Sequence, residues 1–115
     1  MAIKYKDIKE TIVSRPFSNR EISIIEKIEN FIDDEIKTNF DNEPLRFNVS
    51  IIEFRYDPIQ KTSYAFQDIK TIRKSLMSKE LKRRYEAAGW VWEYESGEDD
   101  GPNRPAIDYW LLKGK

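Results

Sequence analysis

Acidic, basic and aromatic side chains are prominent in this chain of 115 residues, and the sequence contains neither cysteine nor histidine. Without cysteine, disulfides, thiolate metal sites and thiol nucleophiles are excluded. Without histidine, the usual general base and the commonest transition-metal ligand are missing. The glycine-rich phosphate loops, the zinc-protease motif and the serine-hydrolase elbow are also absent from the sequence. We therefore expect a protein that is not an enzyme and that binds no cofactor.

Acidic residues lie close together near the C-terminal end of the sequence. They are Glu93, Glu95, Glu98, Asp99, Asp100 and Asp108. Mg²⁺ and Ca²⁺ prefer such carboxylate oxygens, but the spacing of these residues matches no EF-hand loop. We interpret the cluster as a solvated acidic turn and predict no metal site. Such a turn can imitate the phosphates of a nucleic acid or attract the basic surface of a partner.

Basic residues recur along residues 70–84, a stretch with helical character. They are Lys70, Arg73, Lys74, Lys79, Lys82, Arg83 and Arg84. The patch best placed to neutralise phosphates consists of Lys79, Lys82, Arg83 and Arg84. A solvated helix face is the plainer interpretation, because Glu80 and Glu86 lie among the basic residues. The whole chain has 20 basic and 21 acidic residues and a net charge of −1, so it has no overall electrostatic preference for nucleic acid or membranes.

Periodic apolar residues predict the first elements of the fold. Ser18 and Glu21 form a capping box at the start of a helix predicted over 18–40. The apolar face of this helix is a series of isoleucines. A strand is predicted over 47–56, and its apolar phase changes midway, which indicates a bulge or two covered faces. Residues 1–17 are either an amphipathic helix or an arm packed on the domain.

Residues 67–88 are predicted to be helical, either as one kinked helix or as two helices. The apolar stripe of the first half is rotated around the helix axis from the stripe of the second half. Ser78 is a suitable cap for a second helix at the junction. Gly89 follows as the residue type that ends a helix in the left-handed conformation.

Two strands joined by a polar turn are predicted after this helix. The first places three aromatic residues on one face, Trp90, Trp92 and Tyr94, which we expect to form the core beneath the helices. On the second strand, Trp110 and Leu112 share a face with Asp108. An unpaired buried aspartate is costly, so we expect this face to be open to solvent.

The open face predicts a binding surface for a protein partner. Its expected members are Trp110, Leu112, Glu93, Glu95, Asp99 and Asp100. An exposed tryptophan rimmed by acidic residues is a plausible centre for contact with a basic partner.

The expected fold is α+β, with a three-stranded antiparallel sheet and helices packed on one of its faces. The elements follow in the order α-β-α-β-β within a single domain over residues 1–115. A winged helix is the alternative, because it has the same order and would use 78–88 as its recognition helix and 97–105 as its wing. The long strand at 47–56 favours the plain sheet, since winged helices usually have a very short strand there.

The pattern RRYEAAGWVWEY, followed by a polar turn and AIDYWLL, resembles the helix–GW–strand–strand C-terminal half of small phage-encoded α+β accessory proteins. The resemblance covers about a third of the chain. It implies a small accessory or host-interacting viral protein, and it carries over no catalytic residue.

The function that we expect is that of a non-enzymatic protein-binding module, such as a phage-type regulator or inhibitor of a host factor. Two alternatives stay open: nucleic-acid binding through the basic residues of 70–84, and a structural role in a virion. The N-terminal sequence lacks the apolar region of a signal peptide, and no apolar run is long enough for a membrane span. We therefore expect a monomer or homodimer in the cytoplasm, the host's if the protein is viral, without membrane contact.

Overall fold

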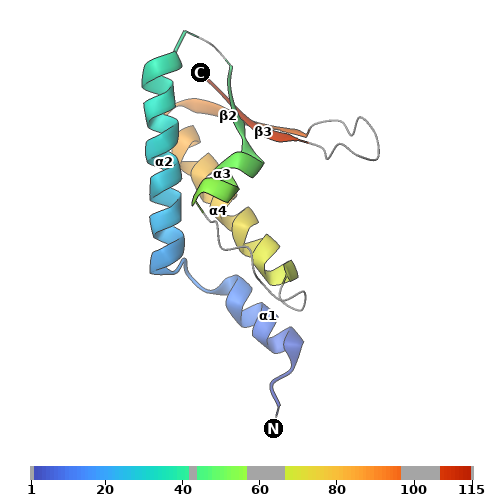
Figure 1. Ribbon diagram of the computed structural model, residues 1–115. Helices are drawn as coiled ribbons and strands as arrows, with labels where there is room; N and C mark the ends of the chain where they lie inside the picture. Colours follow the sequence, from blue (N-terminus) through green and yellow to red (C-terminus); the bar gives the residue numbers. More distant parts are fainter. Residues whose placement is uncertain (1, 42–43, 57–66, 97–106, 115) are drawn as a thin grey trace, which may run out of the picture.

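A computed structural model describes residues 2–41, 44–56, 67–96 and 107–114 (Figure 1). The elements, in chain order, are α1 (Tyr5–Ser14), α2 (Asn19–Asn39), β1 (Leu45–Asn48), α3 (Val49–Tyr56), α4 (Gln67–Ala87), β2 (Trp90–Ser96) and β3 (Asp108–Gly114). The strands form an antiparallel sheet in the order β1-β3-β2, so the last strand is the central one. Buried side chains of the sheet pack against those of α2, α3 and α4, which confirms the predicted α+β fold.

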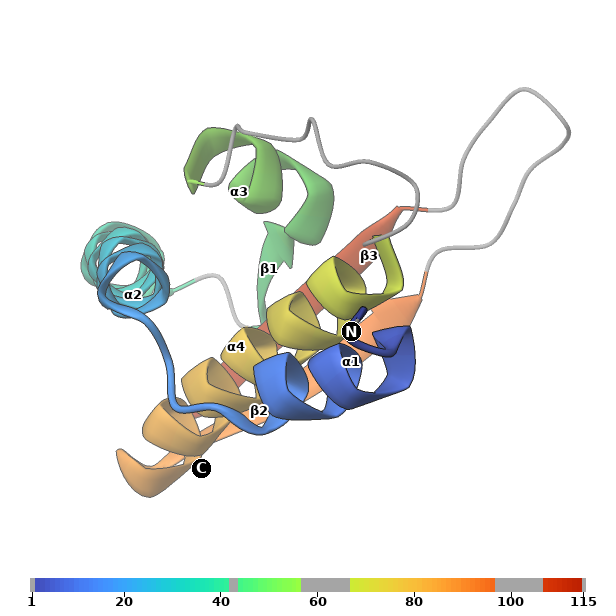
Figure 2. The same ribbon diagram turned by 90° about the horizontal axis from the view of Figure 1, so that it is seen from below.

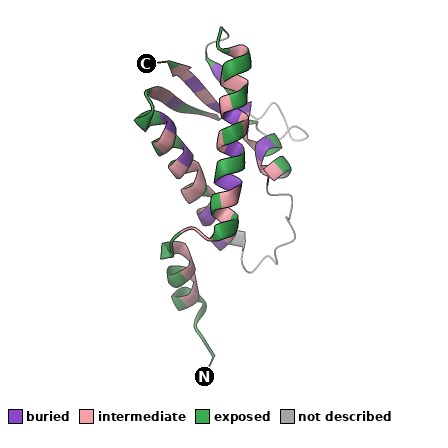
Figure 3. Cartoon of the chain, turned by 90° about the vertical axis from the view of Figure 1, so that its left-hand side faces the viewer, coloured by how far each residue is buried: buried purple, intermediate pink, exposed green. Residues whose placement is uncertain are grey.

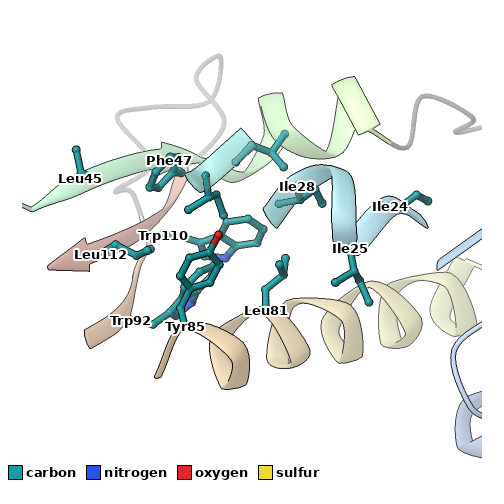
Figure 4. Close-up of a cluster of buried hydrophobic side chains, with 12 residues drawn as sticks. Ile24, Ile25, Ile28, Leu45, Phe47, Leu81, Tyr85, Trp92, Trp110 and Leu112 are labelled. Atoms are coloured by element: carbon teal, nitrogen blue, oxygen red, sulfur yellow. The ribbon is translucent and has the colours of Figure 1, made fainter. Parts of the chain in front are cut away.

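The long helix α2 begins where the sequence predicts. The Glu21 N–H donates to Ser18 Oγ at 3.1 Å and the Ser18 N–H donates to Glu21 Oε1 at 3.0 Å, so the capping box is formed. The buried face of the helix consists of isoleucines, Ile24, Ile25, Ile28 and Ile32. These side chains belong to the same apolar cluster as the buried residues of α3, α4 and the sheet, and α2 packs against α3 and α4 (Figure 4).

The prediction of a strand over 47–56 is wrong beyond residue 48, where the chain continues as the helix α3. Asn48 brings about the change, because its Oδ1 accepts a hydrogen bond from the Ile51 N–H at 3.1 Å, as an N-cap residue does. The change of phase in the sequence is therefore a change from strand period to helix period, and it turns Ile52 into the core. The sequence favoured a plain sheet over a winged helix because the predicted strand was long. With 4 residues, β1 no longer supports that preference.

Trp110 and Leu112 are buried, so the prediction that their face of the sheet is open is wrong. Trp110 is 4% exposed and Leu112 is 0% exposed. In the register of the sheet, Trp110 lies between Phe47 and Tyr94. The ring centroids of Trp92 and Trp110 are 5.1 Å apart, beneath the helices (Figure 4).

The prediction assumed that Asp108 would be buried with Trp110 if their face were covered. Asp108 instead lies at the end of β3, opposite Ser96, and not in the middle of the covered face. The residue is only partly buried, and its carboxylate is near enough to the Tyr94 hydroxyl to raise the pKa of Tyr94. A carboxylate that keeps contact with water carries little desolvation cost. The open face of the sheet is the other one, and it carries Glu93 and Glu95.

The region 67–88 forms one helix, α4, so the alternative of two helices is wrong. Its buried side advances by four residues at a time, through Ile69, Arg73, Met77, Leu81 and Tyr85. The sequence shows two stripes because a charged residue, Arg73, occupies one position of the buried line. Ser78 lies inside the helix and not at a cap.

Gly89 ends α4 in the way that the sequence predicts. Its φ is 95°, in the region that residues with a Cβ rarely adopt. Its N–H donates to the carbonyl of Glu86 at 3.1 Å, which satisfies one of the last helix carbonyls. The turn sends the chain directly into β2, and the Tyr85 and Trp92 rings then lie 5.6 Å apart.

The N-terminal region forms a helix, α1, which lies beside α4 (Figure 2). None of its residues is buried, in contrast to α2 and α4 (Figure 3). Polar contacts hold it instead: the Tyr5 hydroxyl donates to the Asp68 carboxylate, and Lys9 Nζ lies 2.9 Å from the same group.

Candidate functional site

The six residues that the sequence predicts as a surface for a protein partner do not lie together in the fold. Trp110 and Leu112 lie in the core, so they cannot contact a partner while the domain is folded. Asp99 and Asp100 lie outside the described residues. Only Glu93 and Glu95 are placed where the prediction requires them, on the open face of the sheet.

The open face of the sheet is electrostatically balanced. Lys113 Nζ lies 3.5 Å from Glu93 Oε1, and Arg46 Nη2 lies 3.6 Å from Glu95 Oε2. Half-buried apolar side chains lie beside these pairs on the same face, namely Val91, Tyr109 and Leu111. A face with paired charges has little long-range attraction for a partner of either sign.

A groove of about 610 Å³ lies between α3, α4 and the helix-facing side of the sheet. The wall on α4 consists of hydroxyl and lysine side chains, among them Thr71, Ser75, Ser78, Lys79 and Lys82. The opposite side is aromatic and acidic, with Trp92, Tyr94, Trp110 and Asp108 from the sheet and Glu53 from α3. The groove therefore has one cationic, hydrogen-bonding wall and one wall suited to aromatic contact.

The polar wall follows from the helical geometry of α4. Side chains three and four residues apart lie on the same side of a helix. The hydroxyl and lysine residues of the wall have this spacing in the sequence. Because Leu81 and Tyr85 occupy the buried side of the same turns, the polar residues face away from the core.

Two arginines of the predicted basic patch are engaged within the protein. Arg83 Nη2 lies 2.6 Å from Glu80 Oε1, and Arg84 Nε lies 3.1 Å from the same atom. Arg84 Nη1 also lies 3.1 Å from Glu29 Oε2. Hydrogen bonds from Arg83 and Arg84 lower the pKa of Glu80 to about 2, so this carboxylate is ionised at neutral pH and keeps both arginines occupied.

Two lysines of the patch remain available. Lys79 and Lys82 are exposed, and neither forms an ion pair with another residue that the structure describes. Lys74, one turn earlier on the same wall, lies 3.6 Å from the Glu53 carboxylate across the groove. Within the described part of the chain, Lys79 and Lys82 therefore carry the positive charge of the groove that no acidic side chain neutralises.

Tyr94 is the aromatic residue that the groove exposes. Its exposed fraction is 60%, whereas Trp92 is buried, so the prediction that Tyr94 belongs to the core is wrong. The hydrogen bond to Asp108 raises the pKa of Tyr94, and the hydroxyl therefore stays protonated at neutral pH. The signal in the sequence was its position at the end of the aromatic strand, close to the polar residues of 97–105.

Arg73 is a basic residue that does not belong to the groove. It is 7% exposed, and its Nη1 donates to the carbonyls of Val13 at 3.1 Å and Arg15 at 2.9 Å. Its guanidinium carbon lies 5.4 Å from the centre of the Phe17 ring. The periodicity of α4 was the only signal for this burial, since a charged residue is normally assigned to the surface.

The described residues contain no group of three or more acidic residues arranged to hold a metal ion. Within the same ranges, no helix combines the length with the apolarity that a membrane span requires. No protein-family model, curated protein or solved structure matches this chain. The resemblance to small phage accessory proteins therefore stays a prediction.

Proposed function

We propose that the protein is a nucleic-acid-binding module that uses the groove between α4 and the sheet, and that it is not an enzyme. The observation that carries the proposal is the position of Lys79 and Lys82, exposed and without ion-pair partners among the described residues, on the wall opposite the exposed ring of Tyr94. The basic run and the aromatic strand are separate features of the sequence. Their side chains line a single groove in the fold.

The chemistry of this groove suits a phosphate-bearing polymer. Lysine ammonium groups neutralise phosphates, and the hydroxyls of Ser75 and Ser78 on the same wall are of the type that donates to phosphate oxygens. A net charge of −1 over the whole chain does not oppose this binding, because salt screens charges more than about 10 Å away. The local charge of the α4 wall therefore decides the interaction.

The test is direct binding of labelled DNA and RNA to the full chain at about 50 mM salt, where phosphate contacts are strong. We expect measurable binding, and we expect the double variant Lys79→Glu/Lys82→Glu to abolish it. Lys27→Glu/Lys37→Glu is the matched control, because it makes the same change of charge on exposed positions of α2. Equal binding by the two double variants, or no binding by the wild type, would exclude the groove as a nucleic-acid site.

A protein partner on the open face of the sheet is the second candidate. It is supported by the apolar side chains Val91, Tyr109 and Leu111, which lie beside charge pairs on this face, as in a small interface. The variant Leu111→Glu tests it. Capture of a specific protein by the wild type and by the double variant of the two groove lysines, but not by Leu111→Glu, would favour this face over the groove.

A further inference from the structure

We infer that the groove takes single-stranded and not duplex nucleic acid, with a base stacked on Tyr94 and the phosphates against the α4 wall. This inference rests on the proposed function and names its ligand. The carrying observation is the asymmetry of the groove, which has lysines and hydroxyls on one wall and an exposed aromatic ring with carboxylates on the other.

The two walls of the groove attract different parts of a nucleotide, the phosphate and the base. A phosphate is attracted to Lys79 and Lys82 on α4 and is repelled by the carboxylates of Asp108 and Glu53 on the opposite side. A base has no such repulsion, and an aromatic ring offers it a stacking surface. The nucleotide is therefore oriented with its backbone toward the helix and its base toward Tyr94.

The Tyr94 ring is already accessible in the protein without a ligand. The residue is 60% exposed, and its hydroxyl is near enough to the Asp108 carboxylate for that group to raise the pKa of Tyr94. A tyrosine side chain has few rotatable bonds to fix, so the ring loses little conformational freedom on binding. Because every base has a π-face, stacking on Tyr94 accepts many sequences.

A duplex cannot use the same groove equally well. Its bases are stacked on one another, so the Tyr94 ring has no free base to contact. Charge alone would then have to supply the affinity, and proteins that bind duplexes through charge typically neutralise about 6–10 phosphates. Here Arg83 and Arg84 are held by acidic partners, whereas Lys79 and Lys82 have no ion-pair partner among the residues that the structure describes.

The experiment compares an oligothymidine of about 12 nucleotides, within the range of site sizes used by single-strand binders, with a duplex of the same length. Binding to the full chain is measured by fluorescence anisotropy at about 50 mM salt. The variants are Tyr94→Ala, Tyr94→Phe, which keeps the ring and loses the hydroxyl, and Lys82→Glu. Circular dichroism establishes that each variant is folded.

We expect the wild type to bind the single strand more tightly than the duplex. Tyr94→Ala should weaken single-strand binding by roughly 5- to 150-fold, the range that loss of one stacking contact produces, and should leave duplex binding unchanged. Tyr94→Phe should keep most of the affinity, whereas Lys82→Glu should weaken binding to both ligands.

Two other outcomes separate this inference from the proposed function. If single strand and duplex bind alike, and Tyr94→Ala changes neither while Lys82→Glu weakens both, the groove binds phosphates only. The inference then fails and the proposed function stands. If neither ligand binds the wild type, both fail.

Discussion

The guanidinium of Arg73 donates two hydrogen bonds to the carboxylate of Glu21, from Nε at 2.9 Å and from Nη2 at 2.8 Å. The side chains of both residues are almost fully buried, with exposed fractions of 8% and 12%. Glu21 also closes the capping box of α2, and Arg73 also donates to the carbonyl of Val13 in the last turn of α1 and to that of Arg15. One ion pair therefore joins α1, α2 and α4, although α1 itself has no buried residue.

Removal of Arg73 is predicted to destabilise the domain strongly. Arg73→Met removes the two-pronged partner of the Glu21 carboxylate and leaves the exposed Arg15, whose Nη2 is 4.0 Å from Glu21 Oε1. Breaking a buried ion pair in this way costs about 3–5 kcal/mol. Arg73→Lys should recover only part of the loss, because an ammonium group cannot reproduce the two-pronged contact or reach the carbonyls at the same time. Denaturant unfolding measures both changes. A loss below about 1 kcal/mol for Arg73→Met, the level of a surface ion pair, would contradict the role assigned to this pair.

The same ion pair predicts a loss of stability in acid. Burial raises the pKa of the Glu21 carboxyl, but hydrogen bonds from Arg73 and Ser18 outweigh this effect and hold the pKa below its ordinary value of 4.5. A carboxyl with a lowered pKa in the folded state stabilises the fold above its unfolded pKa, and this contribution is lost as the pH falls. We expect the melting temperature to decrease progressively below a pH of about 4.5. Glu21→Gln should be less stable at neutral pH and should show a shallower decrease in acid.

Gly89→Ala is predicted to destabilise the domain through the backbone alone. A Cβ at this position meets no atom within 4 Å, so no clash contributes. The positive φ of 95° remains, and a left-handed residue with a Cβ costs about 1–2 kcal/mol. Gly89→Asn should cost less than Gly89→Ala, because asparagine tolerates this region better. Equal unfolding free energies for the two variants would show that φ is not the cause.

Trp110→Ala is predicted to cost about 3–5 kcal/mol, as expected for truncation of a buried tryptophan. Tyr94→Ala is the matched control, because it truncates the cross-strand neighbour of Trp110 at an exposed position. We expect this control to change stability by no more than about 0.5 kcal/mol. Comparable losses in the two variants, measured by urea unfolding, would mean that Tyr94 is covered and that the groove is not open.

The salt dependence of single-strand binding is predicted to be shallow. Each neutralised phosphate contributes a slope of about −0.7 to the logarithm of the binding constant against the logarithm of salt concentration, so two lysines give about −1.4. Lys79→Ala should reduce the slope to about −0.7, since one phosphate contact is lost. A much steeper slope in the wild type would indicate that Arg83 and Arg84 leave their acidic partners to bind phosphates.

The elements with local signals could be predicted from the sequence, and those that depend on tertiary contacts could not. Ser18, Glu21 and Gly89 act on the backbone of their own helix ends, so their roles are visible in the sequence. Asn48 is a weaker local signal, and the apolar residues that follow it suit a strand as well as a helix.

Arg73 and Asp108 show why the remaining predictions failed. The burial of Arg73 depends on Glu21 and on carbonyls far away in the sequence, and the periodicity of α4 does not reveal these partners. Asp108 was used to choose the open face of the sheet, but its position at the strand end removes the cost on which that choice depended. The groove was missed for the same reason, because its walls come from separate parts of the chain.

The central place of β3 in the sheet has a consequence for the order in which the protein folds. Both neighbours of β3 precede it in the chain, and β1 has no strand partner until β3 has been synthesised. At about 5–20 residues per second, β1 leaves the ribosome several seconds before β3. During that interval the apolar faces of Leu45 and Phe47 lack the strand against which they pack, so a nascent chain stalled before β3 should be far more sensitive to proteases than the released protein.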